Sequence, residues 1–197
     1  RIKNSILGLT LYRLPPISVL PIFSEISLTK GGGNIKAKYP DASFVILMVS
    51  RLTHEKNIPL AIRAFRKVAD EFPGAFLFIV GDGPERERLG EIARHGGVAD
   101  RVQFLGRLNY LQLADYYAAA DVLVLASSRE GWANVLLESM ACGTPVVATR
   151  IWGTPEVVSE PCAGQLVEER TPLALANGIR ALLARVPDRS TTRRYAE

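Results

Sequence analysis

The sequence predicts an α/β fold in which a doubly wound parallel sheet is covered by helices on both faces. Two observations support this prediction. Short apolar runs of strand length alternate with longer segments whose apolar residues recur every three or four positions, as in amphipathic helices. The first run, Phe44 to Val49, is apolar throughout, which is typical of a strand buried on both faces. Strands that alternate with helices of this length form βαβ units and therefore a parallel sheet.

The elements of this α/β part follow from the same patterns, taken in chain order. After the strand at 44–49, the segment 59–72 has apolar residues at three- and four-residue intervals, so we expect a helix with one solvated, charged face. A Gly-Asp-Gly-Pro turn at 81–84 then separates a strand from a helix, and a Gly-Thr-Pro break at 143–145 separates a helix from a strand. The remaining strands are expected at 75–80, 102–105, 122–126, 146–148 and 165–167, and the remaining helices at 85–95, 111–119, 134–142 and 172–184.

Three segments are expected along the chain. Residues 1–42 form an irregular connector with a short first strand at Ser18 to Ile22, and residues 43–185 form the α/β domain. Residues 186–197 form a basic C-terminal tail. The chain starts at Arg1 without a Met and without the apolar stretch of a signal peptide, so we expect it to be part of a longer protein.

The composition indicates an ordinary globular protein. Of its 197 residues, 48% are hydrophobic and 22% are charged, both close to the averages of globular domains. The two cysteines, Cys142 and Cys162, are too few for a disulfide framework and lack metal-ligand spacing, so a reducing, cytoplasmic setting is expected. No apolar run approaches the roughly 20 residues of a membrane-spanning helix.

The chain is mildly basic, with a formal net charge of +4. Such an excess is compatible with a phosphate-bearing ligand, an anionic membrane surface, or no charged partner at all. Nucleic acid is not expected as a partner, because the arginines that cluster at the C-terminus are not interleaved with aromatic residues. These arginines could instead contact an anionic membrane surface. They are Arg185, Arg189, Arg193 and Arg194.

A doubly wound sheet binds its ligands beyond the carboxyl ends of the strands. Right-handed crossovers bring all of these ends to one edge of the sheet. The loops that deserve inspection therefore begin at Ser50, Gly81, Gly106, Ser127 and Thr149.

The first of these loops, residues 50–57, contains two separated cations. Arg51 and Lys56 are suited to hold a diphosphate, because each of their contacts with it would be a charge-assisted hydrogen bond. The alternative is a solvated loop with a surface pair between Glu55 and Lys56, and the spacing alone does not separate the two interpretations. His54 is not expected to act as a general base, since no carboxylate or nucleophile accompanies it at a suitable spacing.

Two further loops contain glycine. Gly81, Gly83 and Gly106 would let a ligand approach the backbone closely, although the need for a tight turn explains them equally well. Arg107 and Leu108 follow Gly106, so a flat nucleobase could lie against this segment.

The loop after the strand at 122–126 carries two carboxylates near a helix start. The helix expected from Asn134 presents backbone N–H groups without intrahelical partners, which suits an anion. Glu130 and Glu138 would repel a phosphate, but ionised carboxylates readily accept hydrogen bonds from sugar hydroxyls. Taken singly, Glu130 could be an acid that favours a helix N-terminus, and Glu138 an exposed helical residue. Together with the neighbouring loops, they favour a site that binds sugar hydroxyls.

These segments resemble a known family. Residues 130–149 closely resemble the signature of retaining GT-B glycosyltransferases of the glycosyltransferase group 1 family, with Glu130 and Glu138 at the spacing of its Glu-x7-Glu motif. The segments 50–57, 81–84 and 104–106 match further motifs of the family in the same order and spacing. The resemblance covers about residues 43–184, which is most of the chain.

The resemblance implies that the chain is the C-terminal, donor-binding, Rossmann-like half of a GT-B fold. The enzyme would transfer a sugar from a UDP- or GDP-type nucleotide diphosphate sugar, with retention, in glycan, polysaccharide or glycolipid biosynthesis. Arg51 and Lys56 would clamp the diphosphate and stabilise the departing nucleotide, and Glu130 would bind the transferred sugar near the reacting carbon. Glu138 would accept hydrogen bonds from the ribose. The other expected donor-binding residues are Gly81, Gly83, Arg107, Leu108, Gly131, Trp132, Ala133, Asn134, Val135 and Leu136.

The resemblance also implies partners that the chain does not contain. In the family, an N-terminal domain binds the acceptor and supplies a Gly-rich loop and a His near the reaction centre. Without it, this chain is expected to bind donor weakly and not to turn over. The expected partners are the nucleotide sugar, the missing acceptor domain, a glycan or lipid-linked acceptor and an anionic membrane surface, with no metal or other cofactor. Peripheral attachment to the membrane would be compatible with a cytoplasmic location.

Three departures from the family pattern stand out. Ala133 replaces the usual second glycine of the Glu-Gly-aromatic-Gly turn, which would restrict the backbone beside the sugar. Trp152 stands where a pair of glycines is common, and the usual Asn-Gly-Val-Asp of the connector is replaced by residues 23–26.

Two other functions remain open at the level of sequence. The chain could be a non-catalytic module that binds nucleotide sugars with the same motifs, or part of a nucleotide-sugar epimerase of the same two-domain layout. The epimerase is the weaker of the two, because the Glu-x7-Glu form looks more like that of the transferases.

Overall fold

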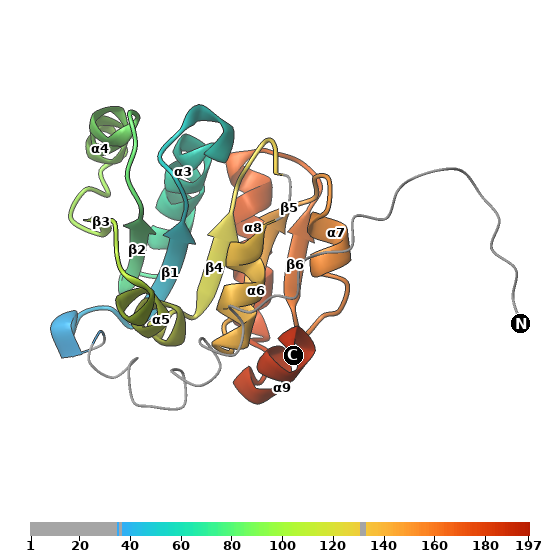
Figure 1. Cartoon of the computed structure of the whole chain (residues 1–197). Helices are drawn as coiled ribbons and strands as arrows, with labels where there is room; N and C mark the ends of the chain where they lie inside the picture. Colours follow the sequence, from blue (N-terminus) through green and yellow to red (C-terminus); the bar gives the residue numbers. More distant parts are fainter. Residues whose placement is uncertain (1–34, 36, 131–132) are drawn as a thin grey trace, which may run out of the picture.

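The computed structural model describes residue 35 and residues 37–130 and 133–197. The strand expected at Ser18 to Ile22 and most of the connector at 1–42 lie outside the described residues, as do Gly131 and Trp132. Within the described part, parallel strands form one sheet with helices on both faces (Figure 1). The predicted fold class is confirmed.

Every strand and helix predicted between residues 43 and 185 is present, and the helices at 54–56, 154–157 and 189–196 were not predicted. The strands are β1 (Phe44–Val49), β2 (Ala75–Val80), β3 (Val102–Gly106), β4 (Val122–Leu125), β5 (Val146–Thr149) and β6 (Gly164–Val167). The helices are η1 (His54–Lys56), α3 (Ile58–Ala69), α4 (Arg86–His95), α5 (Tyr110–Ala119), α6 (Asn134–Ala141), α7 (Thr154–Val157), α8 (Pro172–Ala184) and α9 (Arg189–Ala196).

The strand order in the sheet is β3-β2-β1-β4-β5-β6. β1 pairs with β2 along its whole length, from Phe44 opposite Ala75 to Val49 opposite Val80. On its other side β1 pairs with β4, with Ile46 opposite Val122. The chain therefore winds outward in one direction from β1 to β3 and in the other direction from β4 to β6. The order reverses between β1 and β4, and a doubly wound sheet places its ligand site at this switch point.

Alternate side chains of the strands point to opposite faces and build two separate cores. Ile46 and Met48 of β1 pack on the face covered by α3, α4 and α8. Val45 and Leu47 pack on the other face, which is covered by α5, α6 and α9. Figure 1 shows α5 and α6 on one side of the sheet and α3 and α8 on the other. Because β1 is buried on both faces, its continuous apolar sequence is explained.

The main difference from the sequence prediction is at the C-terminus. Residues 189–196, expected to be part of a basic tail, form helix α9. Its N-cap residue Asp188 accepts a hydrogen bond from the Thr191 backbone N–H at 3.0 Å. Thr192 is buried, and Arg189 reaches across to backbone carbonyls at the end of α5. This segment belongs to the body of the domain, because its own capping and these contacts hold it there.

A smaller difference concerns the end of α3. The helix ends at Ala69 rather than at Phe72. Phe72 precedes Pro73, and the residue before a proline is sterically disfavoured in the helical region. Phe72 is nevertheless close enough to Phe44 for their rings to pack, with centroids 6.4 Å apart.

In the described part of the chain, no helix combines the length and the apolar character needed to cross a bilayer.

Candidate functional site

The loops after β1 and β4 lie against each other at the switch point of the sheet (Figure 1). The backbone N–H of Ser128 donates to the backbone carbonyl of Glu55 at 2.8 Å. The Ser128 hydroxyl donates to the same carbonyl at 3.2 Å. These bonds hold the loop of residues 50–57 against the loop that follows β4. That all the residues predicted from the two loops serve one site stays a prediction.

An ion pair between Lys56 and Glu130 lies at the centre of this junction. The Lys56 ammonium lies 2.7 Å from Oε1 of Glu130, and the Ser127 hydroxyl donates to the same oxygen at 2.5 Å. The Glu130 side chain is only 9% exposed and that of Lys56 is 25% exposed. The Glu55 to Lys56 surface pair considered above is not formed, since Lys56 turns across the junction to a carboxylate that is better shielded from water.

Arg51 extends from the same loop into solvent. Among the described residues its side chain has neither a hydrogen bond nor an ion pair, and it is exposed. The backbone beside it is fixed, because the Leu52 N–H donates to the Asp82 carbonyl at 3.0 Å and the Leu52 carbonyl accepts from the Glu85 N–H at 3.1 Å. Arg51 is therefore a charged group on an anchored backbone.

Gly81 and Gly83 have a structural role in this anchoring. Gly81 has a φ of +125°, and a Cβ at this position would lie 1.8 Å from the Ser50 carbonyl oxygen. A Cβ on Gly83 would lie 2.5 Å from the Leu52 carbonyl oxygen. The loop after β2 can approach the loop that carries Arg51 only because neither residue has a side chain. Direct contact of these glycines with a donor stays a prediction.

Helix α6 begins beside the ion pair and lacks a side-chain cap. Its N-cap residue, Ala133, has φ −89° and ψ 73° and forms no capping hydrogen bond. This φ lies within the range of ordinary L-residues, so alanine is accommodated here without positive-φ strain. Asn134 is exposed, Val135 is half-buried and Leu136 is fully buried in the core. The Leu136 N–H donates to the Ala133 carbonyl at 3.0 Å, so the N–H groups of Asn134 and Val135 are the ones in the first turn that are suited to bind an anion.

Glu138, one turn further along α6, has a different partner from Glu130. Oε2 of Glu138 accepts a hydrogen bond from the Tyr117 hydroxyl at 2.9 Å. Burial raises the pKa of Glu138, and the hydrogen bond from Tyr117 partly offsets this rise. Burial also raises the pKa of Tyr117 well above its ordinary value, with a further contribution from the Glu138 charge. Glu138 is thus a half-buried, oriented carboxylate and not the exposed helical residue considered as an alternative.

Tyr117 is a residue beside this site that the sequence did not single out. It lies in the last part of α5, and the hydrogen bond joins residues 21 positions apart. In the sequence, Tyr117 has the pattern of an apolar core residue, and it is fully buried in that core. The one feature of the sequence that could have indicated this contact is the tyrosine itself, because a buried tyrosine hydroxyl usually has a hydrogen-bond partner.

Arg107 and Leu108 differ in exposure and in their neighbours. The Arg107 side chain is 85% exposed, and its Nε lies 4.0 Å from the Asp82 carboxylate, which places Arg107 next to the Gly81 to Gly83 turn. Leu108 is half-buried and lines a depression of about 300 Å³ with Leu105 and Tyr116. Their approach to a nucleobase stays a prediction.

Trp152 is an unusual feature of the loop after β5. Its φ of +43° is uncommon for a residue other than glycine and exceptional for a bulky one. The side chain is 70% exposed, and the Arg129 guanidinium lies 5.9 Å from its ring centroid. The backbone thus adopts here the left-handed conformation that glycine favours, although the residue is a tryptophan.

No group of three or more His, Cys, Asp or Glu side chains within residues 35, 37–130 and 133–197 is arranged to hold a metal ion. The absence of a metal requirement stays a prediction.

Comparison with known proteins relates this geometry to a family. The family of glycosyl transferases group 1 matches residues 34–197. D-inositol 3-phosphate glycosyltransferase from Acidothermus cellulolyticus is 35% identical over 180 residues, which cover 85% of this chain and 40% of that protein. The lipopolysaccharide core biosynthesis glycosyltransferase LpsE from Rhizobium meliloti is 34% identical over 181 residues, covering 92% of this chain and 51% of that protein.

A solved structure agrees with these relatives. HepE from Anabaena, in complex with UDP and glucose, superposes with a TM-score of 0.73 at 26% identity. The match covers 85% of this chain and 46% of HepE. The chain thus spans about half the length of the relatives that it matches. Since the family match covers most of the chain and includes the loops described above, the chain belongs to the glycosyl transferases group 1 family.

Proposed function

We propose that this chain is the donor-binding half of a glycosyltransferase that uses a UDP- or GDP-type nucleotide diphosphate sugar and retains the configuration at the anomeric carbon. The observation that carries the proposal is the Lys56 to Glu130 ion pair, which joins the loops after β1 and β4 at the switch point of the sheet. The UDP and glucose bound to HepE, a related protein, support a ligand of this chemical class.

The diphosphate would bind between Arg51, Lys56 and the uncapped start of α6. Arg51 supplies a planar fork of donors, and Lys56 supplies a point charge. As the bond to the sugar breaks, negative charge grows on the leaving phosphate, and these positive groups stabilise it more strongly than they stabilise the bound donor. Transfer therefore proceeds through electrostatic stabilisation of the leaving group.

Lys56 has to exchange its partner for this to happen. In the structure its ammonium contacts Oε1 of Glu130 at 2.7 Å. A diphosphate carries more negative charge than one carboxylate and would draw Lys56 toward itself. Glu130, still oriented by Ser127, would then have acceptor positions for hydroxyls of the transferred sugar. The ion pair therefore keeps both side chains at the junction and is broken when donor binds.

Glu138 would accept the ribose hydroxyls, with Tyr117 holding its carboxylate in place. The pKa-lowering hydrogen bond from Tyr117 favours the ionised, acceptor-only form that a diol needs.

The acceptor side of the reaction lies outside this chain. We propose that an N-terminal domain binds a glycan or lipid-linked acceptor, that no metal takes part, and that the isolated chain binds donor without transferring sugar. Sustained sugar transfer by the 197-residue chain alone would contradict this division of labour.

Calorimetric titration with UDP, GDP, their sugars and inorganic pyrophosphate tests the proposal. Arg51→Ala should weaken every diphosphate by about 1.5–3 kcal/mol, the usual contribution of a hydrogen bond to a charged group. Glu138→Ala should weaken UDP but not pyrophosphate, because only UDP carries a ribose. Arg194→Ala, which removes an exposed arginine on α9, is the matched control and should bind as the wild type does. Equal binding by all four proteins would refute the site.

A further inference from the structure

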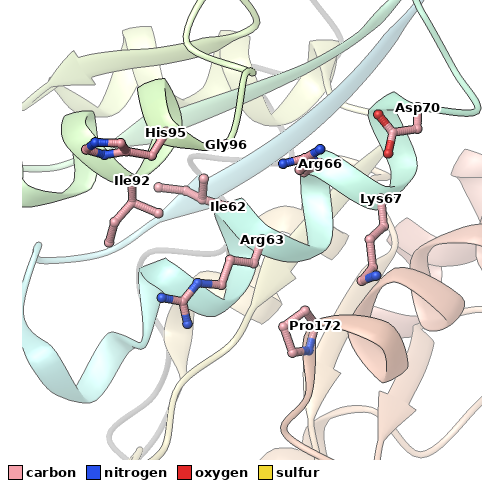
Figure 2. A pocket seen from close by; sticks show the side chains of 9 residues that line it. All are labelled: Ile62, Arg63, Arg66, Lys67, Asp70, Ile92, His95, Gly96 and Pro172. Atoms are coloured by element: carbon pink, nitrogen blue, oxygen red, sulfur yellow. The ribbon is translucent and has the colours of Figure 1, made fainter.

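A second depression lies away from the loop edge, between α3, α4 and the start of α8. Its volume is about 760 Å³, within the range of roughly 300–1,000 Å³ that is usual for small-molecule sites. Figure 2 shows α3 in the middle, with Ile92 and His95 of α4 on one side of it and Pro172 of α8 on the other. The lining residues are Ile62, Arg63, Arg66, Lys67, Asp70, Ile92, His95, Gly96 and Pro172.

The charges around this depression are unbalanced. Arg63, Arg66 and Lys67 lie within little more than one turn of α3, and all three are exposed. Residues three and four apart are neighbours on a helix surface, so these cations repel one another. Asp70 is the one carboxylate among the lining residues, and none of the three cations forms an ion pair with the described residues.

Glu71, the acid that follows Asp70 in the sequence, is already engaged. Glu71 accepts two hydrogen bonds from Arg180 of α8, from Nε at 2.9 Å and from a terminal nitrogen at 2.5 Å. Arg180 also donates to the Lys67 carbonyl at 3.1 Å. This fork fixes Glu71 against α8, so its charge is shared with Arg180 and does not compensate the three cations.

The same depression has an apolar part. Ile62 is buried at its base, while Ile92 and Pro172 are half-buried at its sides. The His95 ring, at the end of α4, is held by a hydrogen-bond contact between its Nδ1 and the Glu91 carbonyl at 2.9 Å. A ligand seated here would therefore meet cationic side chains and apolar surface together.

We propose that this depression binds a phosphorylated small molecule that carries an apolar or planar group, at a site separate from the donor site. The phosphate contacts Arg63, Arg66 and Lys67 through charge-assisted hydrogen bonds, which relieve the repulsion among them. The apolar group lies over Ile62, Ile92 and Pro172. The ligand is a free molecule and not a lipid in a bilayer, because the charged and apolar groups line one depression whose apolar part includes the buried Ile62.

Nuclear magnetic resonance of the ¹⁵N-labelled chain tests this proposal, because amide signals report on each site separately. Phenyl phosphate should shift amides of residues 62–70 and 92–96 saturably, with a several-fold lower Kd than inorganic phosphate. Shifts at residues 50–57 and 133–138 would report on the donor site, so failure at one site is distinguishable from failure at the other.

Variants and a second probe complete the test. Arg63→Glu and Arg66→Glu should each raise the Kd at the α3 site at least about tenfold, as expected for loss of one charge-assisted bond. Arg194→Glu on α9 makes the same charge change on a distant helix and should leave this Kd unchanged. The proposal is overturned if phenyl phosphate gives no saturable shifts at 62–70, if it binds no better than inorganic phosphate, or if the two α3 variants bind like the control. It is also overturned if these residues respond to phosphatidylglycerol vesicles and not to phenyl phosphate.

Discussion

At the scale of single residues, Glu138 is a carboxylate whose burial disfavours its own charge. Its position on the helix that follows the β4 loop could be predicted from the sequence, but its environment could not. That environment depends on the hydroxyl of Tyr117, which α5 brings to α6 through the packing of the core. Ser127, the hydrogen-bond donor to Glu130, is by contrast a local partner, since it lies only three residues away in the same loop.

The raised pKa of Glu138 makes a prediction about stability. Below the unfolded value of about 4.5 the residue is protonated in both states, and between this value and the raised folded pKa the folded state binds more protons. The wild type should therefore lose this part of its stability as the pH rises through that interval. Glu138→Gln keeps an acceptor for Tyr117 and lacks the titration, so its free energy of unfolding should gain on the wild type with rising pH and then level off.

Urea denaturation of both proteins between pH 4 and pH 8 measures this difference. Tyr117→Phe is the companion variant, because losing the hydroxyl should raise the pKa of Glu138 further and shift the interval upward. The interpretation fails if the wild type gains on Glu138→Gln as the pH rises.

At the scale of elements, the strands and helices themselves were predictable. The continuous apolar run of β1 and the three- and four-residue spacing of apolar residues in α3 distinguish a buried strand from an amphipathic helix. The ends were less predictable, as at Phe72, where the periodic pattern continues but Pro73 stops the helix. The residues of α9 have a polar, arginine-rich sequence that resembles a solvated tail. Their helix depends on the Asp188 cap and on contacts with elements far away in the sequence.

Asn57 links the loop that carries Lys56 to helix α3, and its backbone conformation predicts how substitutions there change stability. It is left-handed, with φ 47° and ψ 41°, which asparagine tolerates better than most residues do. Asn57→Ala should lower the free energy of unfolding by about 1 kcal/mol, whereas Asn57→Gly should stay within about 0.5 kcal/mol of the wild type. Equilibrium denaturation of the three proteins measures both. Equal losses in the alanine and glycine variants would show that the asparagine side chain, and not the backbone conformation, matters.

At the scale of the whole molecule, Arg189 attaches the C-terminal helix α9 to the rest of the domain. Its guanidinium donates to the Ala118 carbonyl at 2.6 Å, to the Ala120 carbonyl at 3.1 Å and to the Thr144 hydroxyl at 2.7 Å. One side chain thus ties α9 to the end of α5, where the helix dipole favours a cation, and to the loop before β5.

Removing this fork should destabilise the domain. Arg189→Ala is expected to cost about 2 kcal/mol, because several hydrogen bonds to a charged donor are lost and their acceptors are left partly buried. Arg189→Lys should recover little, since an ammonium cannot reproduce the planar fork. Arg194→Ala, on the exposed side of the same helix, should change the free energy of unfolding by less than about 0.5 kcal/mol. Thermal or urea denaturation compares the three, and a loss in Arg194→Ala as large as that in Arg189→Ala would refute the role of the fork.

The topology of the whole sheet also decided how much of the site could be predicted. Parallel strands bring their carboxyl ends to one edge, so the sequence placed the loops after β1 and β4 together. It did not reveal that Lys56 and Glu130 bind each other, since this pair forms only after β4 inserts beside β1 and joins residues 74 positions apart. Nor did the sequence reveal the depression over α3, whose three cations looked like a solvated helix face.

The most direct measurement of the diphosphate site is the affinity for UDP of Lys56→Ala and Glu130→Gln, determined by calorimetry beside the wild type. If the pair is broken when a diphosphate binds, the two changes act in opposite directions. Lys56→Ala should weaken UDP about ten- to a hundredfold, as expected for loss of a charged hydrogen bond. Glu130→Gln should tighten UDP, because Lys56 no longer has to leave a carboxylate, while it weakens the preference for a UDP-sugar over UDP. Weaker UDP binding by both variants to the same extent, or no change in either, would contradict a diphosphate site between the loops after β1 and β4.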